Sequence, residues 1–173
     1  MSVGTRGDIK VRIGFGYDAH RLKTGRKCIL CGVEIKSEFG PDGHSDADVP
    51  VHALMDAMLG ALALGDIGAH FPDDDEKWRG VSSIELLKAV RLLVNEHGYT
   101  LGNADITIVL QAPRISPHIE LMRACIADAL VIFIEKISVK ATTEERMGFT
   151  GNGTGISSYA VVLLEKRVSP FRD

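Results

Sequence analysis

The sequence predicts one domain of the α/β (α+β) class, with a mixed sheet that helices cover on one face. Strand-like and helix-like segments recur in turn along the chain, which favours such a layered arrangement. The chain has 173 residues, of which 45% are hydrophobic, and this is enough for one substantial core. Because no long linker, repeat or low-complexity tract interrupts it, we assign residues 11–166 to one domain between short tails at 1–10 and 167–173.

Alternating or densely apolar segments mark the strands. Ile106, Ile108 and Leu110 alternate with other residues and predict a half-buried strand over 105–111. Further strands are predicted at 11–17, at 28–35 (one or two short strands around Gly32), at 137–142 and at 156–166. Helices on one face leave the other face of this sheet uncovered, and we expect subunit packing to cover it.

Three segments have the periodicity of helices. Residues 48–63 place apolar side chains three and four apart behind Asp48, a favourable N-cap residue. Ser82 and Glu85 form a capping box that starts a second helix, which ends before Gly98. A third helix is predicted from about residue 117 to residue 134.

Composition argues against several classes of function. The net charge is −3 without a basic run, so nucleic acid is not expected as a partner. We expect no membrane span and no secretory signal, because no segment has the necessary apolar length. Three cysteines, an odd number, favour reduced thiols and a cytoplasmic location. We interpret the C-x-x-C formed by Cys28 and Cys31 as two buried side chains, since a zinc ribbon needs a second pair.

Asp18, His20 and His52 form a candidate metal site. Asp18 and His20 lie two apart in a strand-like run, so their side chains leave the same face. His52 lies near the start of a predicted helix. Two imidazoles and one carboxylate suit zinc, and three protein ligands leave the fourth position open, as in catalytic zinc sites. The net positive charge of such a centre favours an anionic substrate.

The acidic segment 42–56 supports the same site. Asp48, His52 and Asp56 are spaced by four and share one helix face. A metal-bound imidazole usually donates its other N–H to a carboxylate, so we expect Asp48 or Asp56 to accept it. The alternative is a solvated acidic cap on an amphipathic helix.

Three loop segments have compositions suited to a ligand. Residues 65–75 are rich in Gly and Asp, residues 111–118 join a strand to a helix start, and residues 140–145 combine hydroxyls, a cation and carboxylates. The first two have plain alternatives, a helix stop with a solvated turn and a proline-stiffened connection. The glycine-rich run 148–155 does not by itself indicate a phosphate site.

The motifs in these segments resemble those of the 2-C-methyl-D-erythritol 2,4-cyclodiphosphate synthase family, which acts in the non-mevalonate isoprenoid pathway. The resemblance covers residues 12–166. Its motifs are Arg-Ile-Gly-x-Gly-Tyr-Asp-x-His over 12–20, His44-Ser45-Asp46-x-Asp48-Val49, Gly65-Asp66-Ile67-Gly68, Phe71-Pro72-Asp73, Gln111-Ala112-Pro113, Lys140-Ala141-Thr142-Thr143 and Gly148-Phe149-Thr150-Gly151.

The resemblance implies a homotrimer with active sites at subunit interfaces and sheets facing the threefold axis. It implies conversion of 4-diphosphocytidyl-2-C-methyl-D-erythritol 2-phosphate to the cyclic diphosphate with release of CMP. Zinc would bind to Asp18, His20 and His52, and Mg²⁺ or Mn²⁺ to Glu145 and the substrate phosphates. His44 and Thr143 would position and stabilise the reacting phosphates.

The resemblance also implies an extended set of substrate contacts. Around the diphosphate and the methylerythritol phosphate they are Asp18, Ala19, His20, His44, Ser45, Asp66, Ile67, Gly68, Phe71, Pro72, Asp73, Asp74 and Asp75. Around the cytidine and the adjoining interface they are Leu110, Gln111, Ala112, Pro113, Arg114, Ile115, Ser116, Ala141, Thr142, Thr143, Glu144, Glu145, Phe149 and Asn152.

The chain departs from the family pattern at Asn152, Thr154 and Glu144, and mildly at Arg114 and Tyr17. Many members have Arg at the position of Asn152 and Glu at that of Thr154; the arginine binds phosphate near the trimer axis, where some members hold an isoprenoid diphosphate. The expectation of that ligand therefore does not transfer to this chain. Glu144 replaces a common third hydroxyl and could compete for the second metal. Two other functions stay open, a zinc-dependent phosphoesterase and a non-catalytic trimer with a structural metal.

Overall fold

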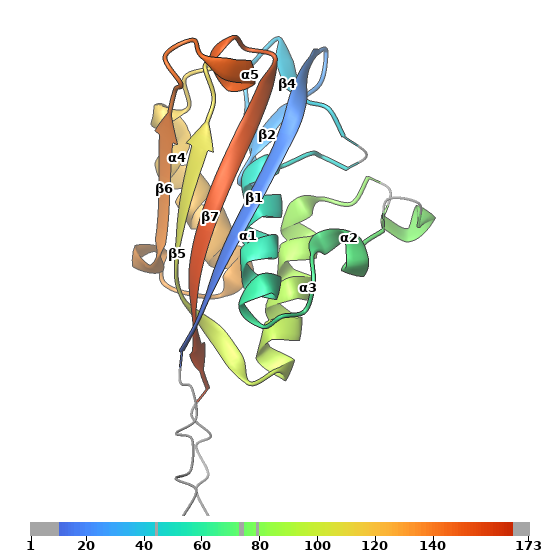
Figure 1. Ribbon diagram of the computed structural model, residues 1–173, viewed down its shortest axis with the longest axis vertical. Helices are drawn as coiled ribbons and strands as arrows, with labels where there is room; N and C mark the ends of the chain where they lie inside the picture. The colour runs from blue at the N-terminus through green and yellow to red at the C-terminus, as the bar shows by residue number, and fades with distance from the viewer. Residues whose placement is uncertain (1–10, 44, 73–74, 79, 168–173) are drawn as a thin grey trace, which may run out of the picture.

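The computed structural model, which describes residues 11–43, 45–72, 75–78 and 80–167, is built on a mixed sheet of five strands (Figure 1). In chain order these are β1 (Val11–Thr24), β4 (Phe39–Pro41), β5 (Tyr99–Val109), β6 (Ile137–Thr142) and β7 (Gly155–Lys166). Their spatial order is β4-β1-β7-β5-β6. The β5–β6 pair is parallel and the other pairs are antiparallel. A separate hairpin consists of β2 (Cys28–Leu30) and β3 (Val33–Ile35).

The longer helices lie along one side of this sheet, and a short one lies at the ends of the strands (Figure 1). The helices are α1 (Val49–Ala61), α2 (Ile67–His70), α3 (Ser83–Glu96), α4 (Ile119–Leu130) and α5 (Gly148–Gly151). Helix α1 packs on β1 and β7, α4 packs on β6, and α3 packs between α1 and α4. Their apolar faces and the inner face of the sheet form one continuous core.

The two faces of the sheet differ sharply in burial. On β7, Ala160 and Val162 point into the core, whereas Tyr159 and Val161 are exposed. On β1, the side chain of Ile13 is 72% exposed and that of Phe15 is 62% exposed. The predicted architecture, a mixed sheet covered by helices on one face, is confirmed, and the opposite face of β1 and β7 is apolar and open.

Two glycines let α1 lie directly on β1. A Cβ added at Gly14 would be 1.8 Å from the carbonyl oxygen of Ala57, and one at Gly16 would be 2.0 Å from that of Ala53. These neighbours are backbone atoms of the helix, which side-chain rotation cannot move. Only glycine therefore permits this close approach between strand and helix.

Two of the three predicted helix starts are confirmed, and the third predicted helix is shorter than expected at both ends. The side chain of Asp48 accepts from Val51 N and that of Ser82 from Ile84 N, so both residues are N-caps as predicted. The predicted helix over 117–134 ends earlier, because Val131 has a left-handed φ of 56° and closes α4. Residues 116–118 and 134–136 at its two ends form short 3₁₀ helices instead.

Several strands are longer or more numerous than predicted. Strand β1 continues to Thr24 and β5 begins at Tyr99, with a register shift between Leu101 and Asn103. Residues 28–35 form two strands, and β4, α2 and α5 were not predicted. The predicted tail at 1–10 lies outside the described residues, as does the predicted tail at 167–173 except for Arg167.

The cysteines of the C-x-x-C motif are buried free thiols, as predicted. Burial raises the pKa of Cys28 to about 11 and raises that of Cys31 well above its ordinary value. In the part of the chain that the structure describes, no helix combines the length and apolar character that a membrane crossing requires.

Candidate metal centre and active site

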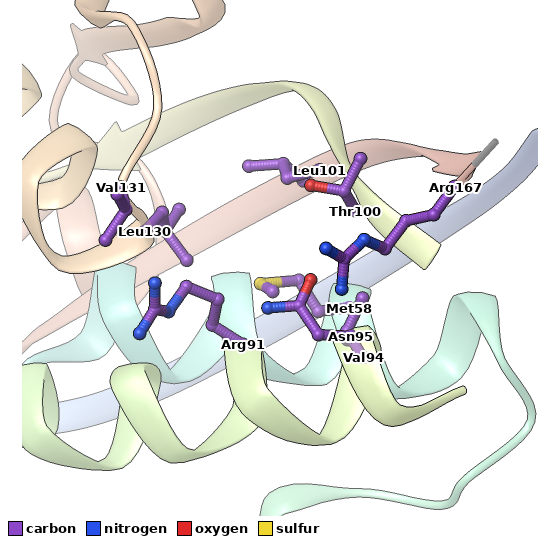
Figure 2. A pocket seen from close by; sticks show the side chains of 9 residues that line it. All are labelled: Met58, Arg91, Val94, Asn95, Thr100, Leu101, Leu130, Val131 and Arg167. Carbon is purple, nitrogen blue, oxygen red and sulfur yellow. The ribbon is translucent and has the colours of Figure 1, made fainter. Parts of the chain in front are cut away.

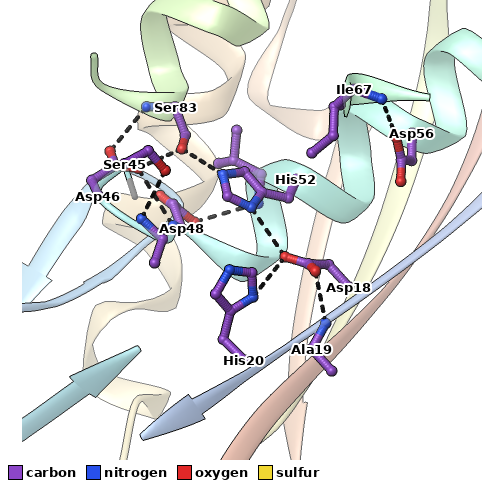
Figure 3. A network of polar contacts seen from close by, with 12 residues as sticks. Asp18, Ala19, His20, Ser45, Asp46, Asp48, His52, Asp56, Ile67 and Ser83 are labelled. Atoms are coloured by element: carbon purple, nitrogen blue, oxygen red, sulfur yellow. Dashed lines mark hydrogen bonds and ion pairs between the residues drawn. The ribbon is translucent and has the colours of Figure 1, made fainter. Parts of the chain in front are cut away.

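Asp18 and His20 on β1 meet His52 on α1, as the sequence predicts (Figure 3). One carboxylate oxygen and one ring nitrogen from each histidine all lie within 4.8 Å of one another. Oδ2 of Asp18 is 3.1 Å from Nδ1 of His20 and 3.0 Å from Nδ1 of His52. Adjacent ligands of a tetrahedral zinc ion with bonds of about 2.0–2.1 Å lie about 3.3 Å apart, so these separations suit a shared ion.

The local fold explains this convergence. Asp18 and His20 are alternate residues of a strand, so both side chains leave the same face. His52 occupies the first turn of α1, directly after the Asp48 cap. The close contact of Gly16 with α1 brings that turn over β1.

The electrostatics of Asp18 and His52 reflect their mutual contact. Burial tends to raise the pKa of Asp18, but its contacts with His20 and His52 outweigh burial and lower the pKa far below the usual range. Burial tends to lower the pKa of His52, but the neighbouring carboxylate of Asp18 raises it overall. Asp18 is therefore an ionised acceptor at neutral pH, the form that a metal ligand requires.

His20 gives a further indication that this site can hold a cation. Its Nδ1 is buried and has no partner with hydrogen-bond geometry among the described residues, although Asp18 Oδ2 is within 3.1 Å. A buried polar atom without a partner is costly. The donor set of two imidazoles and one carboxylate, together with this unpaired nitrogen, fits zinc.

The expected partner of the His52 ring is corrected by the structure. Nε2 of His52 lies 2.9 Å from Oγ of Ser83 on α3 rather than beside Asp48 or Asp56. The Asp48 side chain instead accepts from the backbone N–H groups of Cys31, Gly32 and Val51, at 2.8, 2.6 and 3.3 Å. That of Asp56 accepts from Ile67 N at 2.8 Å (Figure 3). The four-residue spacing on one helix face did not predict the partner of the His52 ring, because both carboxylates accept hydrogen bonds from backbone N–H groups instead.

The segment 65–75 follows α1 and contains the short helix α2. Asp66 caps α2 by accepting from Ala69 N at 3.0 Å, and Ile67 and Gly68 form its first turn. Phe71 packs edge-on against Trp78, with ring centroids 5.0 Å apart. Pro72 and Asp75 flank Asp73 and Asp74, which lie outside the described residues. His44, another predicted site residue, also lies outside them.

The 110–116 and 141–145 segments meet at the carboxyl ends of the parallel strands β5 and β6. Leu110 N donates to Thr142 O at 3.1 Å, which joins the two segments. Oγ1 of Thr143 donates to Oε1 of Glu145 at 3.0 Å, and the hydroxyl of Thr150 donates to Glu144. Beside them Arg114 Nε donates to Ser116 Oγ at 2.9 Å. The other predicted members of this group are Gln111, Ala112, Pro113, Ile115 and Ala141.

The metal centre and this second group are far apart within one chain. Asp18 pairs with Ser158, Ser158 with Ile108, and Ile108 with Ala141. Three steps of about 4.8 Å between strands place Asp18 about 14 Å from Ala141.

Two cavities lie on different sides of the chain. One of about 690 Å³ opens beside the metal centre and is lined by Tyr17, Ala19, His20, Phe149 and Thr154 among others. Near it, Oδ1 of Asn152 accepts from Oγ1 of Thr154 at 2.7 Å.

The other cavity, of about 220 Å³, lies between α3, β5 and the end of α4 (Figure 2). Arg91, Arg167 and several apolar side chains line it, and no predicted site residue does.

Comparisons with known proteins identify the class. The model of the YgbB family matches residues 11–165, so the chain belongs to this family. The chain is 56% identical over 157 residues to the 2-C-methyl-D-erythritol 2,4-cyclodiphosphate synthase of Geobacter metallireducens. The matched region covers 91% of this chain and 100% of that protein.

Solved structures agree with this assignment. A structure of 2C-methyl-D-erythritol-2,4-cyclodiphosphate synthase has a TM-score of 0.83 at 39% identity and covers 89% of this chain and 100% of that one. The CDP complex of IspF from Plasmodium falciparum has a TM-score of 0.81 at 34% identity. The match covers 92% of this chain and 98% of that one. The bifunctional IspDF from Campylobacter jejuni has a TM-score of 0.87 at 39% identity and covers 91% of this chain and 42% of that one.

Proposed function

We propose that this chain is a cyclodiphosphate synthase of the non-mevalonate isoprenoid pathway. It converts 4-diphosphocytidyl-2-C-methyl-D-erythritol 2-phosphate to 2-C-methyl-D-erythritol 2,4-cyclodiphosphate and releases CMP, which makes it a phosphorus–oxygen lyase. The observation that carries this proposal is the convergence of Asp18, His20 and His52 in a chain that matches a synthase over that protein's whole length. Three protein ligands leave a position for a substrate oxygen.

Zinc would bind to Asp18, His20 and His52, and Mg²⁺ or Mn²⁺ to Glu145 together with the substrate phosphates. The exposed carboxylate of Glu145 offers the oxygen ligand that a hard cation prefers. When bound, these ions would supply positive charge that offsets the charge developing on the diphosphate.

The chain's own residues position an intramolecular reaction. An oxygen of the 2-phosphate forms a bond to the β-phosphorus, and the bond from that phosphorus to the bridging oxygen breaks, so that this oxygen leaves on CMP. Because the attacking oxygen is already an anion, no residue has to remove a proton. We assign His44 and Thr143 to positioning and charge stabilisation: His44 and Ser45 contact the β-phosphate region, and Thr143 stabilises the transition state.

The two ends of the substrate would occupy different segments. Asp66, Ile67, Gly68 and the 71–75 segment bind the methylerythritol phosphate end. Leu110–116 and Ala141–143 form the cytidine pocket; two solved relatives are complexes with CDP, which supports a nucleotide site.

A homotrimer would complete each active site. The separation of about 14 Å between Asp18 and Ala141 is too large for one diphosphate to contact both the metal centre and the adjoining Thr143. A neighbouring subunit can supply the second group. The apolar face that contains Ile13, Phe15 and Val161 supports burial of this sheet face between subunits. The three free thiols are compatible with the cytoplasmic location that we propose.

The direct test is a ³¹P NMR time course with the purified chain, the cytidine substrate, Zn²⁺ and Mg²⁺. We expect CMP and a cyclic diphosphate to appear together. CMP with a linear diphosphate would instead identify a phosphoesterase that uses water. Metal-replete protein without turnover would contradict both functions and favour a non-catalytic trimer.

A further inference from the structure

Ser83 lies between the His52 ring and a second carboxylate. It is the first residue of α3 and is fully buried. Its Oγ is 2.9 Å from Nε2 of His52, its backbone N–H donates to Oδ2 of Asp46 at 2.9 Å, and its hydroxyl donates to Oδ1 of the same carboxylate (Figure 3). Three segments of the chain therefore meet at one hydroxyl group.

We propose that Ser83, oriented by Asp46, is a positioning residue that presents Nδ1 of His52 to the metal. This inference rests on metal binding at Asp18, His20 and His52 as proposed above. It adds a connection from the metal centre through α1 to α3 and to the loop that precedes α1.

The count of protons supports this assignment. A serine hydroxyl has one proton, and here Oγ donates that proton to Asp46. Both oxygens of Asp46 accept from Ser83, and Oδ1 also accepts from Asp48 N at 3.4 Å. Oγ can then only accept from His52, so Nε2 must be the protonated ring nitrogen. Once a bound cation takes the place of the direct 3.0 Å contact between Nδ1 and Asp18 Oδ2, the neutral ring offers Nδ1 with its lone pair on the side of Asp18.

The orientation of the ring follows from the same contacts. A metal-binding histidine is held by the hydrogen bond of its other nitrogen, and loss of such a partner typically lowers metal affinity 10- to 100-fold. Here the carboxylate of Asp46 accepts the hydroxyl proton of Ser83, so that the oxygen of Ser83 is left to accept from His52. Helix α3 holds Ser83 in place. A hydrogen bond that merely joined α3 to α1 would affect stability without changing the tautomer of His52.

The test compares Ser83→Ala with Ser82→Ala. Ser82 is the adjacent N-cap and contacts Ile84 N, so its variant perturbs the start of α3 without touching His52. Affinity for Zn²⁺ is measured by competition with a chromophoric chelator, and the absorption spectrum of the Co²⁺-loaded protein reports ligand geometry. We expect Ser83→Ala to bind Zn²⁺ about 10- to 100-fold more weakly with an altered Co²⁺ spectrum, and Ser82→Ala to match the unmodified chain. Ser83→Thr keeps the hydroxyl and should recover most of the affinity.

A second measurement needs no variant. The ¹⁵N shifts and couplings of the His52 ring in the Zn²⁺-loaded chain show which nitrogen carries the proton. We expect Nε2–H and metal-bound Nδ1. Protonated Nδ1, or equal Zn²⁺ affinity and Co²⁺ spectra for the Ser83→Ala and Ser82→Ala variants, would overturn the role of Ser83. Failure of the unmodified chain to bind Zn²⁺ would instead overturn the metal centre itself.

Discussion

Nδ1 of His52 lies 3.0 Å from Oδ2 of Asp18, although the two residues are 34 positions apart in the sequence. One belongs to the first turn of α1 and the other to β1. Their contact exists because glycine at positions 14 and 16 lets the helix backbone lie directly on the strand. The candidate metal centre is therefore a property of the α1–β1 packing.

Replacement of His52 tests the ligand set. His52→Ala removes one of three ligands, so we expect Zn²⁺ affinity and turnover each to fall by more than about 100-fold. Metal content is measured on dialysed protein, and turnover by CMP release. His97→Ala is the matched control, because His97 is exposed and its Nδ1 lies 2.8 Å from Leu93 O at the end of α3, away from the candidate metal centre. Full Zn²⁺ content in His52→Ala would remove His52 from the site.

Gly16→Ala tests the close approach of α1 and β1. The new Cβ would lie 2.0 Å from the Ala53 carbonyl oxygen, so the helix must shift; we expect a loss of about 3 kcal/mol in unfolding free energy and weaker Zn²⁺ binding. Urea denaturation and chelator competition measure these two effects. Gly60→Ala is the control. Gly60 lies in α1, and no atom lies within 4 Å of its added Cβ, so this variant should be as stable as the unmodified chain or more stable by up to about 1 kcal/mol. Equal stability of the two variants would argue against the close approach.

The reactivity of Cys28 should follow its raised pKa. Burial is the main cause of the shift from 9.0 to about 11, and it favours the neutral thiol. Below pH 9 the thiolate population is then about 100-fold smaller than in an unfolded chain, so alkylation should be slow and rise with pH towards 11. Mass spectrometry after iodoacetamide treatment should find Cys125, which is partly exposed, labelled first. Rapid labelling of native Cys28 at pH 7 would contradict its burial.

Phe15→Asp tests the role of the open sheet face. A charge in a buried subunit interface is costly, so we expect the trimer to dissociate and turnover to be lost. Light scattering coupled to size-exclusion chromatography should give about three times the chain mass of 18.7 kDa for the unmodified protein and less for the variant. Phe133→Asp is the control, because this side chain is 78% exposed and lies outside β1 and β7. An unchanged mass for Phe15→Asp would place the interface elsewhere.

Mixing two inactive variants tests whether sites are shared between subunits. Asp18→Asn removes a ligand of the metal centre and Thr143→Ala removes a group at the end of β6. In randomly mixed trimers of the two, about a quarter of the sites would combine an intact Asp18 with an intact Thr143. Turnover should recover towards that fraction after joint refolding. Mixed trimers confirmed by mass spectrometry but without activity would show that one chain supplies both groups.

Much of the fold follows from local sequence patterns. The caps Asp48 and Ser82 mark the starts of two helices because their side chains satisfy backbone donors of the next few residues. The end of α4 was not predictable from periodicity, because apolar spacing continues past Val131 while its backbone becomes left-handed. Strand β4 has three residues and pairs with the end of β1. A segment this short shows no alternating pattern from which the pairing could be predicted.

The sequence alone determined the candidate metal ligands, because the two-residue spacing of Asp18 and His20 in a strand places both side chains on one face and His52 completes a recognisable donor set. Tertiary structure alone decided the partner of the His52 ring and the distance between the two halves of the site. Ser83 reaches His52 through the packing of α3 on α1, and Asp18 is separated from Ala141 by the order of strands in the sheet. Contacts between residues distant in the chain depend on how whole helices and strands pack, and the spacing of residues within one element does not specify that packing.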